Sequence, residues 1–190
     1  MTMLLSLQRA LFEPLNRADW LLTTLARFLF AAILLIYFWK SALTKLGDGI
    51  LGIFRPSDGA YAQIFPKLME SVSYNTSELG LYEYVVVLAG TWAEFILPFL
   101  VVVGLLTRLA SLGMIGFIVV MSLTDLYGHG AISEASTLGA WFDGQPGGII
   151  LDQRALWIFL LLTLVIKGGG PLSVDRILMR RAEHRQDVTE

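Results

Sequence analysis

The sequence predicts an all-α membrane protein, a bundle of four transmembrane helices accompanied by short interfacial amphipathic helices. Hydrophobic residues make up 55% of the 190 residues, charged residues make up only 16%, and the mean hydropathy is +0.65. A soluble domain carries about 25% charged residues. Four apolar segments also approach the length of about 20 residues that a helix needs to cross a bilayer. The chain length suits one domain, so we treat residues 1–190 as a single membrane domain.

The predicted spans cover roughly residues 21–42, 82–105, 109–127 and 154–170. The second and third spans are joined by a very short link, which predicts an antiparallel hairpin. The uninterrupted apolar core of the fourth span is short, so this span reaches the required length only if the helix extends at both ends.

Three further segments, roughly residues 3–16, 57–74 and 173–184, are predicted to lie at the membrane interface, because apolar residues recur on one helical face. Pro66 interrupts the second segment, so either one kinked helix or two short ones are expected. In the third segment, Ser173 is expected to cap a short helix, with Asp175 near the positive end of that same helix.

Lysine and arginine residues flank the spans unevenly, and this bias sets the expected orientation. The N-terminal flank carries Arg9, Arg17 and Arg27, and the link between spans two and three carries Arg108. The C-terminal tail carries five more, namely Lys167, Arg176, Arg180, Arg181 and Arg185. The loop over residues 128–153 has none. Both termini are therefore expected in the cytoplasm, as an even number of spans requires.

Glu94 lies near the middle of the second span, where a charged group costs at least about 2.5–3.5 kcal/mol on insertion scales. It shares one helical face with Gly90 and Gly104, and small residues allow close helix packing, so this face is predicted to be the packed interior. Pro98 has no N–H for the Glu94 carbonyl, which predicts a polar pocket or a water site at this level. Two interpretations stay open: a ligand or proton role for Glu94, and a hydrogen-bonded carboxyl that only fixes helix packing.

Four other residues are candidates for the same site. Trp92 lies beside Glu94, and its indole N–H needs a partner at that depth, so it is expected to line a pocket for a flat ring. Arg27 and Lys45 share one face of the first span, and both can extend to lipid headgroups. For Lys45, pairing with an outer carboxylate is an equal alternative, with Asp125 as the candidate partner.

Metal and haem chemistry has little support in this sequence. The absence of cysteine excludes disulfides, iron–sulfur clusters and cysteine-ligated zinc. The two histidines, His129 and His184, lie outside every apolar segment, so no haem or copper is expected to be bound by this chain alone. His129 is a weak metal candidate, because Asp125 lies four residues before it, and a solvated loop histidine is the alternative. Nothing resembles a basic nucleic-acid-binding tract.

Three stretches of the chain resemble the DoxX family of small bacterial membrane proteins. The first runs from Arg27 to Ser41-Ala-Leu-Thr-Lys45-Leu, with Ser41 where the family usually has glycine. The second is Ala93-Glu94 through Gly104-Leu-Leu-Thr-Arg-Leu-Ala110, and the third joins Asp152-Gln-Arg-Ala-Leu-Trp to Gly168-Gly-Gly-Pro-Leu-Ser-Val-Asp175. The resemblance implies a four-helix protein of the bacterial inner membrane. Some relatives are linked to quinone-dependent oxidation or to oxidative-stress complexes.

Three functions remain open on these grounds. The first is an accessory subunit of a quinone-linked or oxidative-stress-related oxidoreductase, which binds a quinone, a lipid-like ligand or a redox partner and is not an enzyme on its own. The second is small-molecule binding or proton-coupled transport that uses Glu94 as an intramembrane carboxylate. The third is a structural membrane scaffold. A homo-oligomer is compatible with each.

Overall fold

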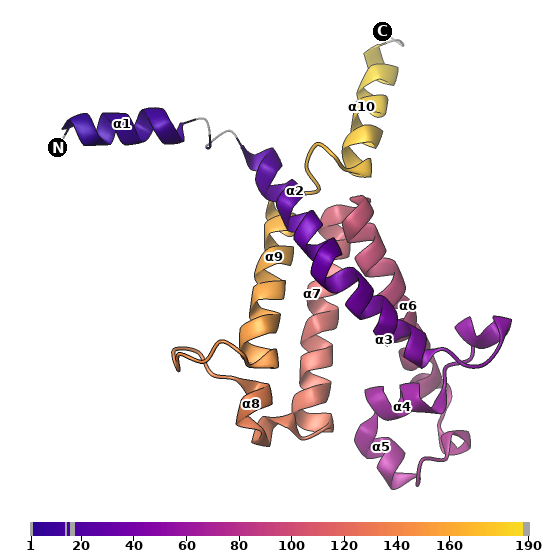
Figure 1. The fold of residues 1–190 in the computed structure, drawn as a ribbon. Coiled ribbons are helices and arrows are strands. Elements are labelled where there is room, and N and C mark those ends of the chain that lie inside the picture. The colour runs from indigo at the N-terminus through magenta and orange to yellow at the C-terminus, as the bar shows by residue number, and fades with distance from the viewer. Residues whose placement is uncertain (1, 14, 16–17, 188–190) are drawn as a thin grey trace.

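Four helices of this chain are long and apolar enough to span a membrane, which confirms the predicted all-α four-helix membrane bundle (Figure 1). The computed structural model describes residues 2–13, 15 and 18–187. The four spans are Asp19–Lys45, Leu81–Val103, Thr107–Gly128 and Ile149–Lys167. Each matches its predicted range to within five residues. The fourth gains its length at its N-terminal end, where a π-helical turn, η7 (Ile149–Gln153), precedes α9 (Arg154–Lys167).

The first span crosses the other three obliquely (Figure 1). It consists of α2 (Asp19–Phe30), the π-helical turn η2 (Ala31–Leu35) and α3 (Ile36–Lys45). Twenty-seven residues give a helix of about 40 Å at a rise of about 1.5 Å per residue, longer than a hydrocarbon core of about 30 Å. Tilt accommodates this excess. A buried stripe at four-residue spacing, made of Ala26, Phe30, Leu34, Phe38 and Ala42, faces the other spans.

The second and third spans form the predicted antiparallel hairpin of α6 (Leu81–Val103) and α7 (Thr107–Leu123). Their link is only residues 104–106, because α7 begins earlier than expected. Gly104 has a φ of +75°, which favours glycine, and a Cβ there would lie 2.6 Å from the Cβ of Ser173. On the α6 face predicted to be interior, Val87, Glu94 and Val101 are buried, which confirms that prediction. α7 continues into a π-helical turn, η5 (Thr124–Gly128).

Shorter helices lie at the two ends of the bundle. At one end, here called the terminal end, α1 (Thr2–Phe12) extends away from the spans and α10 (Val174–Asp187) follows α9, so both described ends of the chain lie on the same side (Figure 1). At the opposite, loop end lie α4 (Asp58–Ile64), α5 (Pro66–Ser71) and α8 (Ala135–Leu138). Pro66 starts α5, so two short helices replace one kinked helix. Three 3-10 turns complete the loops, namely η3 (Ile50–Ile53), η4 (Thr76–Glu78) and η6 (Ala131–Ser133).

Arg27 closes the terminal end by capping the last turn of α6. Its Nε donates to the Val101 carbonyl at 3.2 Å, and Nη2 donates to the Val102 carbonyl. Its Nη1 donates to the carbonyls of Gly169 and Leu172, at 3.0 and 2.8 Å, in the glycine-rich loop after α9. The last carbonyls of a helix have no partner within the helix, so this guanidinium supplies the missing donors. Arg27 is therefore a structural residue in this fold and does not extend to headgroups.

Asp175 caps the start of α7 from a distant part of the chain. Its carboxylate accepts hydrogen bonds from the backbone N–H of Leu106 at 2.7 Å and of Thr107 at 2.8 Å, and from the Thr107 hydroxyl at 2.7 Å. Leu106, at the N-cap position, has no side chain that can do this. Ser173 caps α10 as expected, accepting from the Arg176 N–H at 3.2 Å. Asp175 lies in the first turn of α10, as expected, and its carboxylate is turned toward α7.

The cap at Asp175 should depend on pH. Partial burial tends to raise the pKa of this carboxyl, but the hydrogen bonds from Thr107 and Leu106 and the charge of Arg27 outweigh burial, so its pKa lies below the usual value. The stabilisation is therefore fully present above the ordinary aspartate pKa of about 3.9 and is lost as the pH falls through the lowered value. We expect Asp175→Asn to lower the free energy of unfolding by about 0.5–2 kcal/mol at neutral pH, as for a lost N-cap, and the difference to shrink in acid.

Thermal unfolding in detergent over a pH series measures this difference. Glu70→Gln, which changes an exposed carboxylate of α5 at the loop end, is the control and should have little effect at any pH. A loss of stability in Asp175→Asn that stays constant into acid would contradict a role for the charged carboxylate.

Candidate intramembrane ligand site

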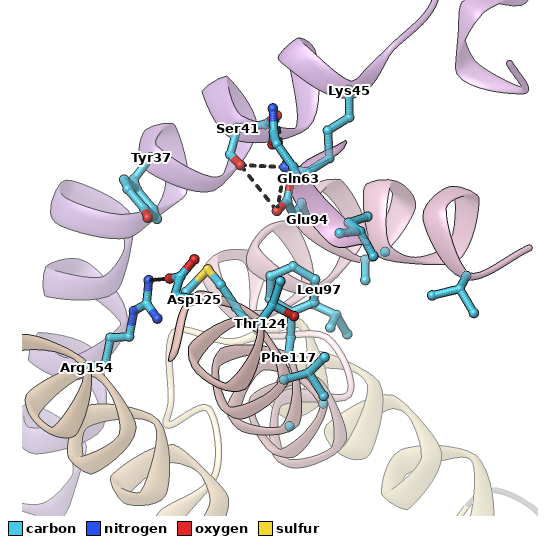
Figure 2. Close-up of a pocket in the computed structure, with 18 of the residues that line it drawn as sticks. Tyr37, Ser41, Lys45, Gln63, Glu94, Leu97, Phe117, Thr124, Asp125 and Arg154 are labelled. Atoms are coloured by element: carbon cyan, nitrogen blue, oxygen red, sulfur yellow. Dashed lines mark hydrogen bonds and ion pairs between the residues drawn. The ribbon is translucent and has the colours of Figure 1, made fainter. Parts of the chain in front are cut away.

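The site is built around a buried ion pair between the first and second spans (Figure 2). The Lys45 ammonium lies 2.9 Å from Glu94 Oε2 and 3.1 Å from Oε1. The two side chains are only 6% and 4% exposed. Ser41, one helical turn before Lys45, accepts from the ammonium at 2.7 Å and donates to Glu94 at 3.3 Å. Glu94 is thus a paired carboxylate, and Lys45 binds it rather than lipid headgroups or Asp125.

A second charged pair lies across the site, between the third and fourth spans. Arg154 Nη2 lies 2.6 Å from Asp125 Oδ2, and Nη1 donates to the Ser122 hydroxyl at 3.0 Å. Asp125 was one candidate partner for Lys45, and it pairs with Arg154 instead. Asp125 lies within η5, and Arg154 directly follows η7. Single π-helical turns are frequent at functional sites, and here two of them place the members of this pair.

A cavity of about 450 Å³ lies between the two pairs, where the sequence predicted a polar pocket beside Glu94. Lys45, Glu94, Asp125 and Arg154 contribute its charged lining. Its other walls are largely apolar and include Tyr37, Ile64, Val86, Leu97, Phe117, Val120 and Met121. Figure 2 shows Tyr37 on one side of the charged groups and Phe117 on another. The combination suits an amphiphilic ligand with a few acceptor oxygens.

Glycines of α6 and α7 make room for this cavity. Gly90, Gly113 and Gly116 all line it. A Cβ at Gly113 would lie 3.2 Å from Leu97, so this position holds α6 and α7 close together. A Cβ at Gly116, in contrast, would meet nothing within 4 Å. The cavity therefore has free space directly over Gly116.

Of the other predicted site residues, His129 lines the cavity, and Trp92 and Arg27 lie elsewhere. Trp92 does not line the cavity: its indole N–H donates to the Ile53 carbonyl at 2.8 Å, and its ring packs edge-on against Phe54. Trp92 thus holds the first loop in place. Arg27 belongs to the terminal end. His129 lines the cavity, and its Nε2 lies 3.0 Å from the Gln63 carbonyl, which ties η5 to α4. Within the described residues, no three His, Asp or Glu side chains are grouped closely enough to hold a metal ion.

Sequence reasoning missed Arg154 and Ser122. Arg154 is 4% exposed, and its Nε has no hydrogen-bond partner among the described residues. It stands at the first position of the predicted fourth span, where no role was predicted for it. The extra helical turn over residues 149–153 carries it inside the bundle. A carboxylate and an arginine at the same end of neighbouring spans were the signal that could have suggested this pair.

Comparisons of the chain with family models, curated proteins and solved structures find no match. The residues that carry the DoxX resemblance nevertheless gather at two places in the fold. Arg27, Gly104 and Asp175 meet at the terminal end. Lys45 and Glu94, with Ser41, meet at the cavity. Stretches that are far apart in the sequence thus form one structural centre and one candidate ligand site.

Breaking the Lys45–Glu94 pair from one side should cost more than removing both charges. Lys45→Met leaves Glu94 buried without a partner, a change that typically costs about 3–5 kcal/mol. We expect the double variant Lys45→Met/Glu94→Gln to recover part of this loss, because no uncompensated charge remains. Unfolding in mixed detergent–SDS micelles measures the free energies.

Lys40→Met is the matched control for this cycle. Lys40 is an exposed lysine on the same helix, and surface substitutions usually change stability by less than about 0.5 kcal/mol. A double variant that is as unstable as the sum of the two single variants would show that the two groups do not stabilise each other.

Proposed function

We propose that this multi-pass membrane protein binds a quinone-like or lipid-like ligand in the cavity between its charged pairs, as an accessory subunit of a membrane oxidoreductase system. The observation that carries the proposal is the cavity itself. Its volume of about 450 Å³ falls in the range of small-molecule sites, about 300–1,000 Å³, and its apolar walls carry a few convergent polar groups. A scaffold alone has no need for such a space.

The polar groups suit a ligand that accepts hydrogen bonds. Lys45 and Arg154 line the cavity and carry N–H donors on an ammonium and a guanidinium. Donors of this kind bind a ligand oxygen that accepts hydrogen bonds. The carbonyl oxygens of a quinone are acceptors of this kind, and Phe117 and Leu97 offer apolar surface to its ring and tail.

Electron transfer would require a partner. The chain has no cysteine, and neither histidine lies within an apolar segment of the sequence. We therefore propose that a separate redox enzyme supplies the flavin or metal, and that this chain holds the quinone and docks that enzyme. The resemblance to the DoxX family supports this proposal and extends it to the bacterial inner membrane, with both termini in the cytoplasm.

A second candidate is proton-coupled transport, favoured by the placement of a carboxylate–ammonium pair on the cavity wall. In this case the proton carrier is Glu94, and substrate uptake into liposomes follows a proton gradient. Gradient-driven uptake that is present in the unmodified protein and absent in Glu94→Gln would favour transport over binding. If neither the unmodified protein nor Glu94→Gln takes up substrate, the result favours ligand binding over transport.

Filling the cavity should abolish ligand binding without harming the fold. Gly116→Leu places a side chain in free space, and leucine has a higher helix propensity than glycine, so we expect unchanged or slightly raised stability. Binding of a short-chain ubiquinone, followed by quenching of tryptophan fluorescence in detergent, should weaken at least about tenfold, equivalent to about 1.4 kcal/mol.

Ala89→Leu is the matched control, because Ala89 is exposed on α6 and does not line the cavity. It should bind the ubiquinone as the unmodified protein does. Equal binding by Gly116→Leu, or no saturable binding by any of the proteins, would contradict a quinone site in this cavity.

A further inference from the structure

The first loop folds back against the second span near the middle of that helix. Trp92 lies eleven residues after Leu81, so its backbone is about 16 Å along α6 at a rise of about 1.5 Å per residue. Its indole N–H holds the carbonyl of Ile53. Lys45, which starts the loop, is bound to Glu94 at a similar level. The next carbonyl, that of Phe54, is held by Tyr84 in the first turn of α6, so the tip lies between the levels of Tyr84 and Trp92, in a hydrocarbon core of about 30 Å.

The tip presents apolar side chains to the outside at this depth. Ile50 is 94% exposed and Leu51 is 59% exposed, and Ile53 and Phe54 are nearly half exposed. Two charged residues, Asp48 and Arg55, flank the tip. The Phe54 carbonyl beside Arg55 accepts from Tyr84 in the first turn of α6 at 2.8 Å, so this flank returns toward the loop end. From there the long arginine side chain reaches the headgroups.

Several backbone groups of the loop are hydrogen-bonded within it, which lowers the cost of placing the segment in hydrocarbon. Gly47 N–H donates to the Gly52 carbonyl at 3.2 Å, and the same carbonyl accepts from Arg55 N–H at 3.2 Å. Ser57 N–H closes the loop onto the Lys45 carbonyl at 2.9 Å. A Cβ at Gly52 would overlap the Gly47 carbonyl, so glycine permits this tight closure.

We propose that residues 50–54 form a re-entrant tip that enters the hydrocarbon core from the loop end and is covered by lipid acyl chains. Two independent features support this: the depth set by Tyr84 and Trp92, and the exposed apolar side chains. The partner is the lipid bilayer and not a second protein, because side chains exposed at this depth of a span face acyl chains. The proposal does not depend on what the cavity binds.

Spin labelling tests the position of the tip, and the absence of cysteine in the chain allows single labels at Ile50→Cys, Phe159→Cys and Ser136→Cys. Phe159 is 70% exposed near the middle of the fourth span and serves as the lipid control. Ser136 is exposed in α8 and serves as the water control. With the protein in lipid nanodiscs, collisions with oxygen report hydrocarbon, and collisions with a water-soluble nickel chelate report the aqueous phase.

The Ile50 label should favour oxygen over the nickel chelate, as the Phe159 label does. A preference for the nickel chelate like that of Ser136 would overturn the proposal. If Ile50→Cys does not yield monodisperse protein, the same measurement is made on Leu51→Cys. A preference for oxygen supports the proposal, and a preference for the nickel chelate overturns it. The Gly116→Leu substitution should leave the result unchanged, which separates this test from that of the cavity.

Discussion

The ion pair between Lys45 and Glu94 is the interaction on which the rest of the loop-end half of the structure depends. Either charge alone at this depth would carry a large desolvation cost, and the pair is stable only because both groups are bound and closed off from lipid. The pairing fixes the last turn of α3 against the middle of α6. This contact makes one wall of the cavity and also sets the depth at which the first loop begins.

The terminal end satisfies the same constraint with different groups. There the unpaired backbone groups of two helix ends must find partners, and the side chains that serve them come from other helices. Arg27 supplies donors to the last turn of α6, and Asp175 supplies acceptors to the first turn of α7. The hairpin turn is therefore held from both sides: the positive Arg27 binds backbone carbonyls at the end of α6, and the negative Asp175 binds backbone N–H groups at the start of α7.

Much of this architecture could be predicted because hydrocarbon leaves few choices. The four spans and the interior face of α6 follow from apolar length and from the spacing of Gly90, Glu94 and Gly104. The pairing of charges was harder to predict, since Lys45 could meet either Glu94 or Asp125, and the choice depends on the tilt of the first span. Tilt is set by packing and not by any local pattern.

Two other features have no signature in one sequence. The π-helical turns that place Asp125 and Arg154 are shifts of a single residue in the hydrogen-bond pattern, and hydrophobic periodicity does not detect them. Trp92 was expected to face a ligand because of its neighbour Glu94. Successive residues on a helix point about 100° apart, however, and the indole is turned to the first loop.

The position of Asp175 in the chain also determines when the start of α7 can be capped during synthesis. The amide groups at the start of α7 are made 68 residues before the carboxylate that binds them. While the fourth span is still being translated, the hairpin turn of spans two and three has no such partner and must rely on water or headgroups. The bundle reaches its final form only when the beginning of α10 emerges and docks. The start of α10 is thus needed to complete the bundle, and a chain that stopped after four complete spans would leave this turn open.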